Sequence, residues 1–368
     1  MGAIGGGQDG DWHLVSDVHL GLPGSERDAA AFARFLSAVD QRRTETRTDL
    51  VLLGDVFELY PDLGVSAEDV VTPASARARL DAVLGGQAEV LQALAQLVRS
   101  GVGVRIVPGN HDLDLHRPEL QERLMEELGA GGGAGVGEVT FHPWIYWVPG
   151  VLHAEHGHRY HDINVVPADP LCADGAIVLP AATRAALDPR PFAVAVLDAL
   201  RRDGRPWLRR RPQLTADRAA KLGREIGVEG AVVQDLDALA SPTVASTVAR
   251  LAVTAARGPG TAGDYLQRQA PDIAAAFRDG GPVVHAFGHT HRAACTLLAG
   301  GSVYANCGTW TGEFFSGEAD PADRWYTSLR VSCRGGEVDV ALLEWLDQSG
   351  SERTVRSAAV GSASASPR

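Results

Sequence analysis

Short apolar runs alternate with helical stretches in the first third of this chain of 368 residues. Runs at 12–16, 49–55 and 103–112 have the length of buried strands, and the last two lead into glycine-containing turns. Helical spacing of apolar residues fills the stretches between them, at 28–43 and 76–99. Strand, helix, strand, helix, strand is the pattern of a layered α/β fold with buried strands.

The rest of the chain predicts an interruption of this core and a return to it. Residues 145–157 predict a strand pair, after which residues 165–280 become rich in alanine, arginine and leucine with helical spacing. We expect this helical insertion to cap a core made of residues 1–164 and 281–348. Residues 349–368 are mostly small and polar and predict a disordered tail. Strand patterns in the second part of the core lie at 282–289, 302–308, 327–333 and 337–345.

The composition limits the class of protein and of partner. It is 45% hydrophobic and 22% charged, which is ordinary for a globular protein. Acidic residues outnumber basic ones by 46 to 34, so we expect no stable nucleic-acid partner. No leader pattern or membrane-length apolar run is present, and the four cysteines form no C-x-x-C pair. We therefore expect reduced thiols and a cytoplasmic location; the oligomeric state is left open.

Most predicted core strands end in residues of metal-binding types. In chain order these groups are Asp17-Val18-His19, Gly54-Asp55, Gly109-Asn110-His111-Asp112, His156-Gly157 and Gly288-His289-Thr290-His291. Ligands of open α/β sheets bind at the carboxyl ends of the strands, so these side chains are expected to meet. Carboxylate, imidazole and amide oxygen together suit divalent transition ions such as manganese, iron or zinc.

In order and in flanking residues, the five groups resemble the motifs of the calcineurin-like metallophosphoesterase family. The family pattern is D-x-H, G-D-x-x, G-N-H-[DE], H-G and G-H-x-H, and the resemblance covers roughly 12–162 and 282–310. It implies a metallophosphoesterase-type β-sandwich flanked by helices, in α/β/β/α layers, with the helical insertion as a cap.

The resemblance also implies a role for each residue and a cofactor of two divalent transition-metal ions, manganese first, with iron or zinc as alternatives. The implied ligands are Asp17, His19 and His291 for the first ion, Asp55 as a bridge between the ions, and Asn110, His156 and His289 for the second. His111 would protonate the leaving oxygen, and Asp112 would orient its imidazole and favour the charged form. The nucleophile would be a hydroxide that bridges the two ions and attacks phosphorus in line.

The stretch HAEHGHRYHD at 153–162 holds four of the chain's 12 histidines. In the family the ligand histidine ends a strand and precedes a glycine, and of the four only His156 does so. His153 lies three residues upstream on the strand and should point to the opposite face, so we expect it to be a packed strand residue. His158 is the second choice as a site residue, and His161 is expected to belong to a loop or a pocket wall.

The substrate implied by the resemblance is a phosphate mono-, di- or pyrophosphate ester of a small or lipid-linked molecule. The segments SDVHLG, GDVFELY and GHTH…YANCGTW most resemble the branch that contains bacterial UDP-2,3-diacylglucosamine pyrophosphatase. His111 stands where that branch often has arginine, and the insertion here is far longer. A nuclease of the same superfamily and a non-catalytic metal-binding scaffold are the alternatives.

Two features each allow two interpretations. Six arginines lie between residues 201 and 211. In one interpretation they form a face of the cap that binds an anionic substrate, or a lipid headgroup at a membrane surface. In the other they form a solvated helix surface. Glu58 stands where many relatives have Asp or Asn, and we expect it to be exposed near the metals in either a functional or a structural role.

Overall fold

The computed structural model describes residues 9–43, 46–60, 70–130, 135–161, 164–187, 269–275, 277, 281–311 and 326–361. The chain divides into two compact units. The first consists of Met1–Pro61, Ala76–His158 and Leu266–Arg368, and the second of Asp62–Ser75 and Arg159–Tyr265. None of the helices in the described ranges is both long and apolar enough to cross a membrane.

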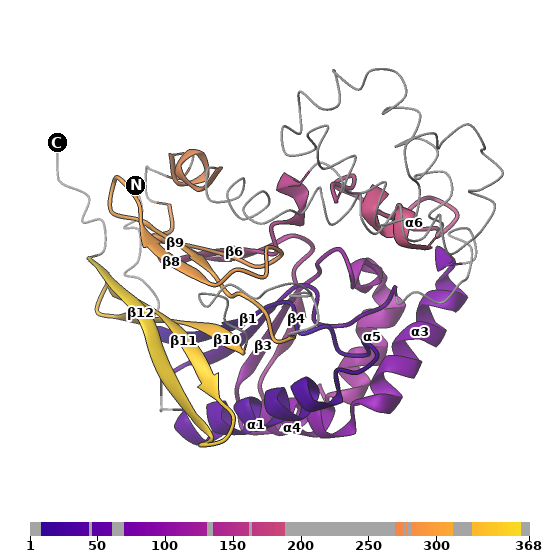
Figure 1. Ribbon diagram of the computed structural model, residues 1–368, viewed down its shortest axis with the longest axis horizontal. Helices are drawn as coiled ribbons and strands as arrows, with labels where there is room; N and C mark the ends of the chain where they lie inside the picture. The colour runs from indigo at the N-terminus through magenta and orange to yellow at the C-terminus, as the bar shows by residue number, and fades with distance from the viewer. Residues whose placement is uncertain are drawn as a thin grey trace, which may run out of the picture. The chain divides into compact units, whose positions relative to one another are not determined.

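Seven strands form the larger sheet of the first unit, in the order β12-β11-β10-β1-β2-β3-β4 (Figure 1). They are β1 (Gly10–Val15), β2 (Thr48–Leu53), β3 (Gly103–Val107), β4 (Val139–Phe141), β10 (Thr327–Arg334), β11 (Glu337–Leu346) and β12 (Ser351–Gly361). Strands β1 to β4 are parallel, and β10 to β12 extend the sheet from β1 in antiparallel pairs. Residues 50–53 of β2 are all apolar because both faces of the strand are buried there, Leu52 against the helices and Val51 against the second sheet.

Five strands form the smaller sheet of the same unit, in the order β5-β6-β7-β9-β8. They are β5 (Ile145–Val148), β6 (Leu152–Glu155), β7 (Val284–Phe287), β8 (Ala294–Leu297) and β9 (Val303–Asn306). The neighbours β6, β7 and β9 are parallel. The strand pair predicted at 145–157 is confirmed, since β5 and β6 pair in antiparallel register on either side of Pro149 and Gly150.

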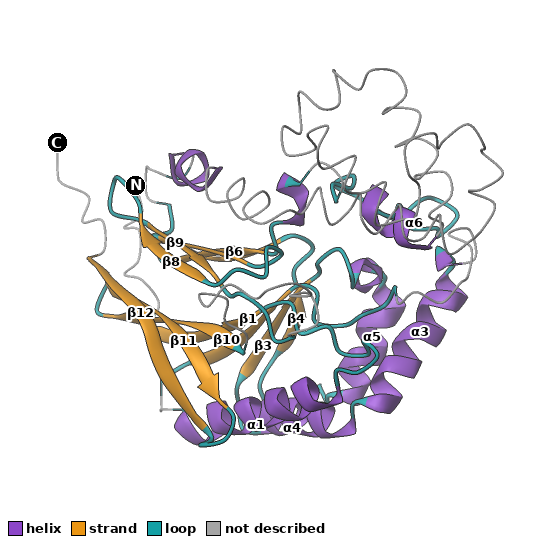
Figure 2. Ribbon diagram, viewed as in Figure 1, coloured by secondary structure: helices purple, strands orange, loops and turns teal. Residues whose placement is uncertain are grey.

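Four helices pack on the face of the larger sheet that points away from the smaller one (Figure 2). They are α1 (Glu26–Arg42), α3 (Pro73–Gly86), α4 (Ala88–Arg99) and α5 (Pro118–Glu127), the last preceded by the short 3-10 helix η1 (Leu113–His116). A second core fills the space between the sheets and includes Trp12 and Leu14 of β1 with Leu152 and Val284 of the smaller sheet. The predicted α/β fold with two packed sheets and flanking helices is therefore confirmed.

The outer face of the smaller sheet is covered by a short piece of chain. Residues 269–275 are helical, and the ring of Phe277 just after them packs on Trp147 and His153, with centroids 4.9 and 5.3 Å away. The described part of the first unit thus has the helix, sheet, sheet, helix order of layers.

Little of the predicted cap is described. The second unit contains α6 (Ala181–Leu187), part of the one-turn helix η2 (His158–Tyr160) and an isolated bridge between Leu171 and Ile177. Residues 188–268 lie outside the described residues, and the arginine-rich run lies among them. The helical cap and its boundaries at 165–280 remain a prediction.

Two predictions about elements are wrong. The helix expected over 76–99 is two helices, because Gly85 and Gly86 at the end of α3 lower its helix propensity and α4 starts afresh at Ala88. The tail expected to be disordered from 349 instead forms β12, which pairs with β11 and packs Val355 and Val360 on the core between the sheets. Residues 362–368 of that tail lie outside the described residues.

Candidate metal centre

The predicted ligands follow the carboxyl ends of five strands. Asp17 and His19 come after β1, Asp55 after β2 and Asn110 after β3, all in the parallel part of the larger sheet. His156 follows β6, and His289 and His291 follow β7, its parallel neighbour in the smaller sheet. The two sheets together bring these ends to one place, and the centre is built from both.

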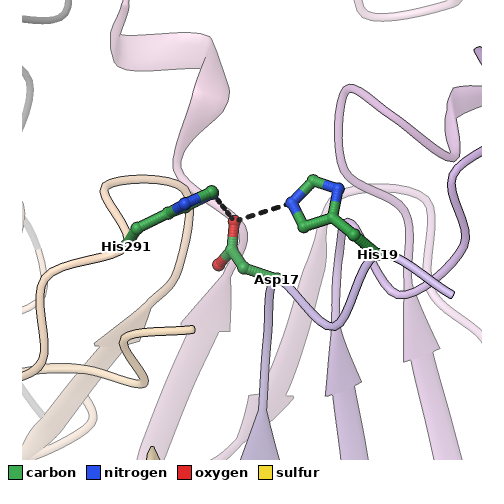
Figure 3. Close-up of side chains that lie close together, drawn as sticks. All are labelled: Asp17, His19 and His291. Atoms are coloured by element: carbon green, nitrogen blue, oxygen red, sulfur yellow. Dashed lines mark ion pairs between the residues drawn. The ribbon is translucent and has the colours of Figure 1, made fainter. Parts of the chain in front are cut away.

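The first ligand group consists of Asp17, His19 and His291, whose donor atoms lie within 4.8 Å of one another. Asp17 Oδ1 is 3.0 Å from His291 Nε2 and 4.0 Å from His19 Nε2 (Figure 3). Its other oxygen, Oδ2, accepts hydrogen bonds from Ser16 Oγ at 2.5 Å and from the His289 backbone N–H at 2.9 Å. One carboxylate oxygen is thereby held by the protein, and the other faces the two imidazoles.

The second ligand group consists of Asp55, His156 and His289 and is equally compact. His156 Nε2 lies 3.1 Å from Asp55 Oδ2, and its ring centroid is 5.3 Å from that of His289. His156 Nδ1 donates to the Leu53 carbonyl oxygen at 2.9 Å. A ligand histidine usually has its second nitrogen tied in this way, because the bond fixes the tautomer and points Nε2 at the ion.

Asn110 lies in the loop after β3, and its buried side-chain oxygen supports a role as a ligand of the second ion. It is 1% exposed, and its Oδ1 has no hydrogen-bond partner. A buried amide oxygen without a partner is costly, and a cation would satisfy it. Gly109 beside it packs so tightly on the second ligand group that a Cβ would lie 2.2 Å from Asp55 Oδ1. With carboxylates and imidazoles around it, this donor set fits a pair of divalent transition ions.

The backbone is unusual at the same residues. Six non-glycine residues in the described ranges have positive φ, and five of them are predicted ligands. The six are Asp17, His19, Asp55, His289, His291 and Tyr326. The left-handed region is unfavourable for side chains with a Cβ, so such conformations persist where the surrounding structure enforces them, and they gather at functional sites. The strain here is concentrated at the residues that converge.

The electrostatics of the two groups favour positive charge between the carboxylates. Burial raises the pKa of Asp17, but the charges of His291 and His156 outweigh it and lower the pKa below its usual range. The same competition, with His156 and His111, holds the pKa of Asp55 well below its usual range. Burial lowers the pKa of His156, yet Asp55 and Asp17 raise it to about 10. Cations are stabilised at this centre whether they are protons on imidazole or metal ions.

Sequence comparison agrees with this geometry. Residues 10–184 match the model of the family described as calcineurin-like phosphoesterase. Over these residues the chain is similar to that family. The match covers four of the five motif groups, and the fifth, with His289 and His291, lies beyond it. The contact between His291 and Asp17 joins that fifth group to the matched segment.

Comparisons with individual proteins add less. No curated protein sequence matches the chain. A dimetal phosphatase from Danio rerio is 11% identical, with 96% of this chain and 99% of that chain covered and a TM-score of 0.39. Vacuolar Protein Sorting 29 from Cryptosporidium parvum is 12% identical, covers 96% and 98%, and has a TM-score of 0.35. With TM-scores this low, these likenesses support no conclusion about the chain.

The structure corrects the prediction for Glu58. Glu58 is 3% exposed, not exposed as expected. Its Oε2 lies 3.0 Å from His19 Nδ1 and 2.8 Å from His111 Nδ1. Burial raises its pKa, but the charge of His111 and the hydrogen bonds from both imidazoles lower it to about 2. Glu58 therefore links a ligand of the first group to the predicted catalytic histidine.

The role predicted for Asp112 stays a prediction, and its contacts in the structure are with the backbone. Its carboxylate accepts hydrogen bonds from the backbone N–H groups of Gly109, Val56 and Phe57, at 2.6, 2.8 and 3.3 Å. Its pKa is raised to about 6 by burial and by the nearby charge of Asp55. Asp112 ties the loop after β2 to the loop after β3, and the carboxylate in contact with His111 Nδ1 is that of Glu58. In the sequence, the short spacing from Asp55 to Glu58 was the signal that could have identified Glu58 as the contact of His111.

The four histidines of 153–162 are separated as the strand alternation predicts. His153 is 1% exposed and packs beside His285 and Phe287, with its Nε2 3.1 Å from Glu155 Oε1. His158 is buried, and its ring centroid is 5.5 Å from that of His156, so it borders the second ligand group. His161 lies in the second unit, where its Nδ1 is 3.0 Å from the Asn164 side chain.

Proposed function

We propose that the protein is a hydrolase, a dinuclear metal-dependent phosphoesterase. The observation that carries this proposal is the assembly of two ligand groups, each drawn from both sheets, around one point. Asp17, His19 and His291 would hold one ion, and His156, His289 and Asn110 the other, with Asp55 between them. Manganese is the ion we propose first, since carboxylate, imidazole and amide oxygen all suit it.

The protein contributes rigid ligands to this centre. Bound divalent ions would supply an activated water near neutral pH and offset the charge that develops on phosphate. Asp17 keeps one oxygen for an ion because Ser16 and the His289 backbone hold the other. His156 keeps Nε2 for an ion because Leu53 holds Nδ1. Because of these contacts, the ligand atoms are already in position before a substrate binds. Such preorganisation is the basis of electrostatic catalysis.

His111 is proposed as the general acid. Its side chain is 21% exposed, whereas those of Asp17 and His19 are 0% exposed, so it is placed on the side that a substrate can reach. The Glu58 carboxylate accepts a hydrogen bond from His111 Nδ1–H and fixes the ring. This would direct Nε2 toward the leaving oxygen. A general acid of this kind is typically worth about 10²–10⁴-fold in rate.

For the substrate we propose a phosphate mono-, di- or pyrophosphate ester of a small or lipid-linked molecule. The motifs SDVHLG and GDVFELY support the branch with UDP-2,3-diacylglucosamine pyrophosphatase. His111 in place of the arginine common there, and the long insertion, count against identity with that enzyme. A nucleotide–lipid diphosphate therefore belongs in any test beside simpler esters.

A substrate screen tests the proposal. Purified protein with added Mn²⁺ should release phosphate or a phosphomonoester from at least one of three classes: phosphomonoesters, phosphodiesters or pyrophosphates. Asp55→Asn should abolish that turnover. Turnover of DNA alone, weakening steeply with salt, would favour a nuclease instead. If the protein binds two ions and turns over no ester, it is a scaffold, and the proposal fails.

A further inference from the structure

Ser16 lies where the two ligand groups meet. It follows β1 directly, it is 0% exposed, and it is not among the motif residues that predict the metal ligands. Its Oγ is 2.5 Å from Asp17 Oδ2, 2.8 Å from the Leu53 carbonyl oxygen and 3.4 Å from His156 Nδ1. One hydroxyl therefore touches an aspartate of the first ligand group and a histidine of the second.

The contacts of this hydroxyl can be assigned from its chemistry. A serine hydroxyl has one proton to donate and lone pairs to accept with. The ionised Asp17 carboxylate is a stronger acceptor than a peptide carbonyl, and 2.5 Å is typical of a hydroxyl bound to a carboxylate. The proton accordingly points at Asp17 Oδ2. The oxygen then offers a lone pair to the His156 Nδ1–H, whose main acceptor is Leu53.

Ser16 is closely packed by the neighbouring loops, and its Oγ also lies 3.3 Å from the Gly54 carbonyl oxygen. A Cβ on Gly288, in the loop after β7, would lie 1.8 Å from Ser16 Oγ and 2.8 Å from Asp17 Oδ2. The hydroxyl is thus enclosed by the loops after β1, β2, β6 and β7, which carry the ligands of both groups. A change at Ser16 must act on both sides at once.

We propose that Ser16 is a positioning residue that couples the two ligand groups, so that its hydroxyl sets the affinity of both ions together. This inference rests on the two-ion centre proposed above. Without the hydroxyl, Asp17 Oδ2 keeps only the His289 backbone N–H, and His156 loses one of the two oxygens near Nδ1. Both groups then lose preorganisation, although no ligand atom is removed.

The test uses Cd²⁺ as the probe, with ¹¹³Cd NMR to distinguish the sites and competition with a chelator to measure affinity. Ser16→Ala should shift both cadmium resonances and weaken both ions by about 10–100-fold, the usual effect of losing a partner of a ligand. Thermal unfolding of the metal-free variants checks that they fold.

Ser328→Ala is the matched control. Ser328 is 1% exposed in β10, so the same hydroxyl is removed from an equally buried place outside the centre. It should leave both resonances and both affinities unchanged. If wild type shows two resonances and Ser16→Ala alters one or neither, the coupling role is overturned while the two-ion centre stands. A wild type that binds fewer than two ions overturns both proposals.

Discussion

At the scale of single residues, Glu58 contacts two histidines for which we propose different roles, His19 as a metal ligand and His111 as the general acid. The carboxylate lies between His19 and His111 and contacts the Nδ1 atom of each. His19 is fully buried among the ligands, while His111 is partly exposed. The same acid can therefore hold one imidazole for an ion and another for a substrate.

This arrangement predicts a dependence on the leaving group. His111→Ala should slow hydrolysis of an alkyl phosphate ester far more than that of a p-nitrophenyl ester, because p-nitrophenolate leaves without a proton. The loss on the alkyl ester should approach 10²–10⁴-fold. Steady-state rates on both esters measure it, and equal losses would remove the acid role from His111.

Glu58 and Asp112 make a matched pair for the same assay. Glu58→Gln should reproduce the dependence on the leaving group in weaker form, because it loosens the ring of His111. Asp112→Asn should slow both esters alike, because Asp112 bonds to backbone N–H groups of the loops. The reverse pattern would support the role that the sequence predicted for Asp112.

The histidines at the end of β6 give a second contrast. His156→Ala should strip the second ion and lower turnover by orders of magnitude, since its Nε2 faces Asp55. His153→Ala should leave the metal content nearly unchanged, because His153 packs on the opposite face of the strand with Phe277 and His285. Elemental analysis of both variants measures the metal content. Metal loss in His153→Ala alone would mean that His153, and not His156, faces the metal centre.

At the scale of elements, the loops after the strands matter more than the strands themselves. The loops after β2 and β3 pack so closely that Gly109 cannot carry a side chain without meeting Asp55 Oδ1 and its backbone nitrogen, at 2.2 and 2.6 Å. Asp112 ties the same two loops through three backbone N–H groups. The position of Asn110 depends on both features.

Gly109→Ala is therefore expected to damage the centre, and Gly85→Ala is its control. A Cβ at Gly109 meets backbone, so metal content and turnover should fall sharply. A Cβ at Gly85 in α3 meets nothing within 4 Å and should stabilise the helix by about 0.5–1 kcal/mol. Urea unfolding and metal analysis of both variants test this; a Gly109→Ala protein with normal metal content would show that the loops can move apart.

The residues of the candidate site could be predicted from the sequence, but most of the contacts that support them could not. The five motif groups predicted which side chains lie together, because strand ends and turn glycines leave a clear pattern. Whether Glu58 or Asp112 contacts His111 depends on which carboxylate is bonded to backbone N–H groups instead. The sequence pattern does not indicate which backbone N–H groups lie near a carboxylate. β12 was missed for a similar reason, because its small residues gain their order by pairing with β11.

At the scale of the whole molecule, two buried histidines outside the centre link folding to pH. Burial, with Arg330 nearby, lowers the pKa of His13 to about 4. Burial and His153 lower the pKa of His285 to about 4. An unfolded chain takes up these protons near pH 6.5, but the folded protein takes them up only near pH 4. Stability is thus lost as the pH falls from about 6.5 to 4.

His13→Leu should remove part of that loss. The free energy of unfolding of wild type should fall relative to the variant by up to roughly 3 kcal/mol between pH 6.5 and 4, the value of a shift of this size. Urea unfolding at several pH values gives the difference. A difference that stays constant over this range would mean that His13 is protonated in the folded protein.

The central claim concerns the whole centre, since it needs both sheets and all five strand ends. The most direct measurement is elemental analysis of the purified, folded protein after mild loading with Mn²⁺ and removal of excess metal. We expect close to two ions per chain, and close to one after His156→Ala. A stoichiometry of zero or one in wild type, with the fold intact by circular dichroism, would contradict it.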